Sequence, residues 1–156
     1  MRDQRWVAEH RGGPLKKAQH QQLIIWSCAC VEHVLSQLSP DIDDRLKYAL
    51  LIAKQWATGN ATVGGARKAS VGAHAAAREF SNPIEIAISR ASGHAVATAH
   101  MADHSLGGTL YSLKAVKLAG KSVEAERTWQ NQQLPPEIKE LVLSTRIEKE
   151  HHFKLS

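Results

Sequence analysis

The chain has 156 residues, of which 43% are hydrophobic, 5% aromatic and 22% charged, a size and composition that favour one helical domain over two domains or a sheet. Its net charge of +5 is concentrated in the first twenty residues, and the nearly balanced remainder has no Lys/Arg stripe with interleaved aromatics, so nucleic-acid binding is not favoured. No segment approaches the ~20 apolar residues of a membrane span and residues 1–10 hold no apolar run of signal-peptide length, so we expect a cytoplasmic protein without a membrane partner.

The first predicted boundary is Gly12-Gly13-Pro14, which separates a polar basic N-terminal arm, residues 1–14, from a single helical domain, residues 15–150. A helix is expected over 15–38, because its apolar positions recur every three or four residues. These positions are Leu23, Ser27, Val31, Val34, Leu35 and Leu38. The same helix carries the two cysteines, Cys28 and Cys30, which point to opposite sides of a helix and so are not expected to pair.

A second helix is expected to start at Ser39-Pro40, with Ser39 as N-cap and Pro40 in the first helical position. Its apolar side runs to Trp56, and Gly59 supplies the left-handed conformation of a C-cap. Thr62 is expected to cap a third helix that ends near Phe80.

Asn82-Pro83 is another cap-plus-proline start, and the helix it begins should reach at least Thr98 and break near residues 101–104. A fifth helix is expected over 106–118. A sixth follows Ser122, and a last one starts around Pro136 and frays toward a tail, residues 151–156. The sequence therefore predicts an all-α fold, an irregular bundle of six or seven helices. Residues 69–75 and 91–95 have similar sequences, so an arrangement of stacked helix pairs stays open as an alternative.

The segment Gly93–His104 holds the densest group of histidines. If one helix ran through it, His100 and His104 would lie one turn apart, as in helical zinc sites, with His94 about 120° away. A third ligand would then have to come from another element, and the candidates are His74, His33 and Asp103. The alternative is that these histidines hydrogen-bond neighbouring helices and fix their register, which is the more common role for histidines among alanines.

Four residues are candidates for contact with a partner protein: Trp6 and Arg11 on the basic arm, and His74 and Arg78 on one edge of the third helix. Trp56 is expected in the core. The sequence contains no nucleophile elbow, P-loop or dinucleotide fingerprint, so we expect neither catalysis nor a cofactor. A metal-binding protein or metal-dependent enzyme that uses His94, His100 and His104 stays open as the alternative.

Three blocks resemble a bacterial family of immunity proteins, an immunity-5-like helical domain of polymorphic toxin systems. The first block spans 45–59 and includes Trp56 and Gly59, the second spans 73–79, and the third spans 91–105. The third is the most specific block, and its shared residues are Gly93, His94, His100 and His104.

The resemblance implies a small cytoplasmic protein that protects its bacterium by binding a cognate toxin, without catalysis of its own. Complementary charge speeds association, so a basic immunity protein should meet an acidic face of its toxin or use a mainly apolar interface. A homo-oligomer is compatible with the sequence.

Overall fold

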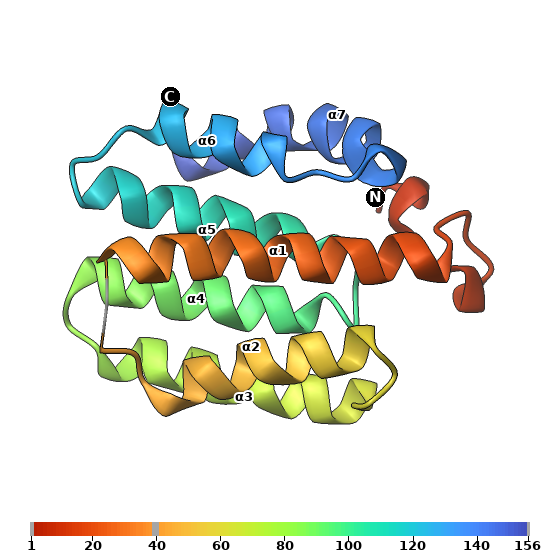
Figure 1. Cartoon of the computed structure of the whole chain (residues 1–156), viewed down its shortest axis with the longest axis horizontal. Coiled ribbons are helices and arrows are strands. Elements are labelled where there is room, and N and C mark those ends of the chain that lie inside the picture. The colour runs from red at the N-terminus through yellow and green to blue at the C-terminus, as the bar shows by residue number, and fades with distance from the viewer. Residues whose placement is uncertain (1, 39–40, 156) are drawn as a thin grey trace.

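The computed structural model describes residues 2–38 and 41–155, and their regular structure is helical. The α-helices are α1 Lys17–Leu38, α2 Asp44–Ala57, α3 Val63–Glu79, α4 Pro83–Ala97, α5 His104–Leu118, α6 Val123–Gln132 and α7 Pro136–Phe153. They lie side by side, with α2 and α3 at one end of the stack, α4, α1 and α5 in the middle, and α6 and α7 at the other end (Figure 1). The predicted all-α fold and irregular bundle are confirmed.

Most helix ends follow the predicted capping chemistry. The side chains of Thr62, Asn82 and Ser122 each accept a hydrogen bond from a backbone N–H of the first turn, at 2.9, 2.8 and 3.1 Å. Gly59 and Gly120 follow α2 and α5 with φ of 81° and 74°, the left-handed conformation that glycine adopts without strain.

The predicted start of α2 was wrong in its cap. Ser39 and Pro40 lie outside the described residues, and α2 begins later, at Asp44. Asp43 is its N-cap, since one carboxylate oxygen accepts the backbone N–H of Arg45 at 2.8 Å and the same carboxylate pairs with the Arg45 guanidinium. A charged cap at the positive end of the helix dipole explains why the helix starts here.

The predicted break between the fourth and fifth helices is confirmed. The helix α4 ends at Ala97, one residue before the expected minimum of Thr98, and α5 starts at His104. His100 therefore lies in the connecting turn, not on a continuous helix, which changes its neighbours from those expected of a zinc pair.

The N-terminal segment is not a free arm. It forms two 3-10 helices, η1 Gln4–Trp6 and η2 Glu9–Arg11, and backbone hydrogen bonds join Leu15 to Val7 and Glu9. The Trp6 side chain is 1% exposed, and its Nε1 donates to Thr145 on α7 at 3.2 Å. Burial of this large aromatic side chain anchors the segment to the domain. The polar sequence of the segment did not predict this burial.

The C-terminal tail is also more ordered than predicted. Helix α7 continues through His151 and His152 to Phe153, and Leu155 beyond it is 4% exposed. Its fraying was expected from its polar residues, but the apolar Phe153 and Leu155 pack against the domain.

The helices enclose two buried clusters of apolar side chains, which we call the alanine core and the aromatic core. The alanine core lies among α1, α2, α3, α4 and α5 and includes Ala69, Ala73, Ala91 and Ala95. The aromatic core joins α1, α5 and α7 to the N-terminal segment and includes Trp6, Trp26, Leu106 and Leu110. Helix α1 contributes to both cores, with Cys28 in the first and Cys30 in the second, as expected for opposite sides of one helix.

Within the described part of the chain, no helix is both long and apolar enough to cross a membrane.

Candidate functional site

Three histidines from three successive helices meet beside the alanine core. His74 of α3 and His94 of α4 have ring centroids 5.4 Å apart and pack edge to face, and the ring of His104 of α5 lies 5.3 Å from that of His94. The Nδ1 atoms of His94 and His104 are 3.2 Å apart, which places one ring as donor and the other as acceptor. We call these three residues the histidine row.

Two glycines make room for the histidine row. A Cβ atom on Gly93 would lie 2.7 Å from Nε2 of His74, and one on Gly107 would lie 2.6 Å from Nδ1 of His94. Since carbon and nitrogen atoms without a bond between them do not approach so closely, each glycine lets an imidazole ring lie against the backbone of the next helix. Gly93 therefore allows α3 to approach α4 closely, and the side chain that fills the space is His74.

The environment of the row favours neutral imidazole rings. Burial, together with smaller effects of the neighbouring histidines and Arg90, lowers the pKa of His94 to about 4. Burial also lowers the pKa of His74 and of His104. The Arg90 guanidinium donates to Nδ1 of His74 at 2.7 Å, a contact that needs the ring nitrogen as an acceptor.

The structure separates His100 from the other predicted histidines. Its Nε2 accepts a hydrogen bond from the Arg67 guanidinium on α3. The alternative of a zinc pair formed by His100 and His104 on one helix is therefore wrong, because the helix breaks between them. Of the candidate third ligands, His74 joins the row, whereas His33 bonds Glu126 at 2.7 Å and stacks on Trp129 at 3.6 Å between ring centroids.

The Nδ1 atoms of His94 and His104 face each other, and Nδ1 of His74 accepts a hydrogen bond from Arg90. Among the described residues, no three His, Cys, Asp or Glu side chains are grouped so that they could hold a metal ion. Each ring contacts the adjacent helix, which is the kind of contact that a register-fixing role would use.

The structure divides the predicted partner-contact residues. Arg11 and Arg78 are exposed, His74 is half-buried in the row, and the burial of Trp6 removes its side chain from the accessible surface. Trp56 is half-buried and packs against the alanine core, with its ring 4.7 Å from that of His20. His20 of α1 donates from Nε2 to the carbonyl of Thr98 at 2.5 Å, so the start of α1 is tied to the turn after α4.

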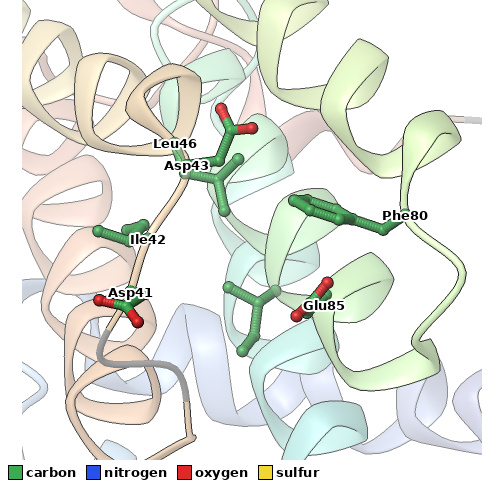
Figure 2. A pocket seen from close by; sticks show the side chains of 7 residues that line it. Asp41, Ile42, Asp43, Leu46, Phe80 and Glu85 are labelled. Carbon is green, nitrogen blue, oxygen red and sulfur yellow. The ribbon is translucent and has the colours of Figure 1, made fainter.

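An acidic hollow of about 220 Å³ lies between the start of α2 and the junction of α3 and α4. In Figure 2 the side chain of Leu46 faces Phe80 across it, and Ile42 and Glu85 also line it. One of its carboxylates already has partners, because Asp43 caps α2 and pairs with Arg45. The same arginine also bonds Glu79 of α3. The Arg45 guanidinium lowers the pKa of the Asp43 carboxyl. These contacts hold the start of α2 against the end of α3.

A larger hollow of about 740 Å³ lies between α5 and the end of α7, and we call it the basic groove. Its lining residues are Tyr111, Lys114, Lys117, Leu118, His152, Phe153 and Lys154. Sequence reasoning missed it. The spacing of Lys114 and Lys117 was visible, but the tail that forms its second wall had been expected to fray.

Comparison with known proteins places the chain in a family. The family model described as Imm-5 like putative immunity protein matches residues 13–137, which is most of the chain and includes α1 to α6. No curated protein and no solved structure matches the chain. The matched range contains all three histidines of the row and both glycines against which they pack, and it covers the three blocks on which the resemblance was based. On this match the chain belongs to the family of Imm-5 like immunity proteins.

Proposed function

We propose that this protein binds a cognate bacterial toxin in the cytoplasm and neutralises it by occupying its surface, without chemistry of its own. The observation that carries the proposal is the family match over residues 13–137. An immunity protein acts through a stable complex, and a few well-packed anchor residues supply most of the affinity of such interfaces.

The geometry of the histidine row supports a binding role over an enzymatic one. Nucleophilic or acid-base catalysis needs titratable groups that reach a substrate. Here His74, His94 and His104 contact one another, Arg90 and Tyr111, and burial keeps them neutral at physiological pH. The contacts of the row thus join α3, α4 and α5 to one another.

We expect the gene of the cognate toxin to lie beside the gene of this protein, and the test is complex formation with that toxin. We expect the purified protein and the isolated toxin domain to elute together at a one-to-one ratio on size exclusion with light scattering. Titration calorimetry should give a dissociation constant in the nanomolar range or below. Separate elution and no heat of binding would refute the proposal. Arg78→Ala is an informative surface variant, because Arg78 is exposed and its replacement leaves both cores intact.

A further inference from the structure

Building on the proposed function, we propose that the basic groove between α5 and α7 is the surface that receives an acidic face of the toxin. The groove joins three lysines to an exposed leucine and two aromatic rings. This combination suits a protein segment that carries Asp or Glu side chains around an apolar one.

Within residues 2–38 and 41–155, no neighbouring carboxylate neutralises the charge of the groove. Among the described residues, no acidic side chain lines the groove, and Lys114, Lys117 and Lys154 make no ion pair with a carboxylate. Lys117 donates to the Lys154 carbonyl, which ties the tail to α5 but leaves the charge of the lysine in place. The acidic hollow differs, because its Asp43 already pairs with Arg45. An uncompensated positive groove attracts an oppositely charged surface and accelerates encounter.

The aromatic rings of the groove favour a protein partner over a nucleic acid. Bases bind single-stranded sites by stacking on open aromatic faces. One face of Tyr111 is covered by the His94 ring at 5.2 Å and 21°, and Phe153 packs against Tyr111 edge to face at 4.9 Å. Lys114 lies 5.9 Å from the centre of the same ring. Tyr111 is therefore already held on several sides and offers little open surface to a base.

The same contacts join the groove to the histidine row. His94 holds the Tyr111 ring from the interior, and Tyr111 in turn supports Phe153 at the end of α7. Because α7 beyond residue 137 lies outside the family match, the groove combines a wall from the family domain with a wall that the match does not cover. Helix α5, inside the family match, thus forms one wall of the groove, and the C-terminal end of α7 forms the other.

The experiment compares two double variants, each of which replaces two lysines with glutamates, so that the net charge changes equally in both. Lys114→Glu with Lys154→Glu alters the groove, and Lys68→Glu with Lys139→Glu alters exposed lysines on α3 and the start of α7. Association and dissociation rates of both variants and the parent are measured by biolayer interferometry against the toxin domain, at low and high salt. A fluorescent 20-base DNA, measured both as a single strand and as a duplex, is the second probe. Thermal melts followed by circular dichroism check that each variant is folded. If the groove reversal melts at a lower temperature than the parent, the double variant Lys114→Gln with Lys154→Gln is used in its place.

We expect the groove reversal to lower the association rate constant by about 10–100-fold at low salt, with a smaller effect at high salt, and the control reversal to change it by less than about threefold. Equal association rates for the two variants, together with a stable complex of the parent protein, would overturn the proposal that the groove binds the toxin. The proposed function would still stand. Tight DNA binding lost in the groove variant would reassign the groove to nucleic acid. Absence of any complex with the parent protein would refute the proposed function itself.

Discussion

The two cores of this protein achieve burial in different ways. The alanine core brings helix backbones close together, and beside it imidazole rings lie against glycines, as with His74 on Gly93. The aromatic core fills the space between more separated elements with tryptophan and leucine side chains. Close packing of small residues tolerates little added volume, whereas a core of large side chains is most sensitive to removed volume.

The aromatic core also contains a buried cation. Arg146 of α7 is 3% exposed, its guanidinium lies 5.8 Å from the Trp26 ring, and it bonds the side chain of Gln130. Burial lowers its pKa. The indole N–H of Trp26 donates to the Gln130 carbonyl at 2.9 Å, so α1, α6 and α7 share one polar network inside an otherwise apolar cluster.

The largest expected effect is truncation in the aromatic core. Trp26→Ala removes a buried ring and leaves Arg146 with less cover, so it should lower the free energy of unfolding by about 3–5 kcal/mol. Urea denaturation followed by circular dichroism measures it. Ile25→Ala, next to it on α1 but 44% exposed, is the control and should cost less than about 1 kcal/mol. Similar losses for both variants would contradict the assignment of this core.

The alanine core should respond most to added volume. Gly93→Ala places a methyl group 2.7 Å from the His74 ring and should destabilise by about 1–3 kcal/mol. Gly72→Ala on α3 is the matched control, since its Cβ meets no atom within 4 Å and alanine favours a helix by roughly 0.5–1 kcal/mol, so it should stabilise.

A second substitution tests whether His74 is the cause. Adding His74→Ala to Gly93→Ala should cost less than the sum of the two single changes, because the crowded ring is gone. Urea melts of the four proteins give this coupling. Strict additivity would show that the clash lies elsewhere.

The alanine core should also weaken in acid. An unfolded histidine has a pKa near 6.5 and so binds a proton at a higher pH than folded His94, whose pKa is about 4. The unfolded state therefore gains protons first, and stability present above pH 6.5 is lost as the pH falls toward 4. Between pH 7.5 and 5.0 we expect a loss of about 1–2 kcal/mol from this partly exposed ring. His94→Gln should flatten the pH dependence, whereas exposed His151→Gln should leave it unchanged, and an unaltered slope in the first variant would contradict a neutral His94.

The smallest effect concerns the two cysteines, one in each core. Both thiols are buried, and burial raises the pKa of Cys28 to about 12 and that of Cys30 as well. Both should react only slowly with a thiol reagent in the native protein at pH 8. Because α1 carries both, we expect equal slow labelling rates, read by mass spectrometry of peptides. Fast labelling of one cysteine alone would show that its core opens independently.

The sequence predicted most helices because capping residues and apolar spacing act locally. Thr62, Asn82 and Ser122 stand at their predicted caps, and the break before His104 follows from the turn signals around it. Long-range packing was less visible. Trp6 and Leu155 gain their burial from α7 and its neighbours, and a polar terminal sequence does not reveal such contacts.

The histidine row shows the same limit. The sequence singled out His94 and His104, but which histidine would join them depended on the pairing of α3 with α4, which no local signal determines. The basic groove likewise needs Lys114 and Lys154 to meet across forty residues of chain.

The most direct test of the account is protection in living cells. The candidate toxin, which we expect to be encoded beside this gene, is induced in a susceptible bacterial host, with or without this protein, and colonies are counted. We predict survival with the parent protein and with the Lys68→Glu, Lys139→Glu control, and reduced survival with the groove reversal at equal protein abundance. Equal killing in the presence and absence of the parent protein would contradict the claim that it neutralises the toxin.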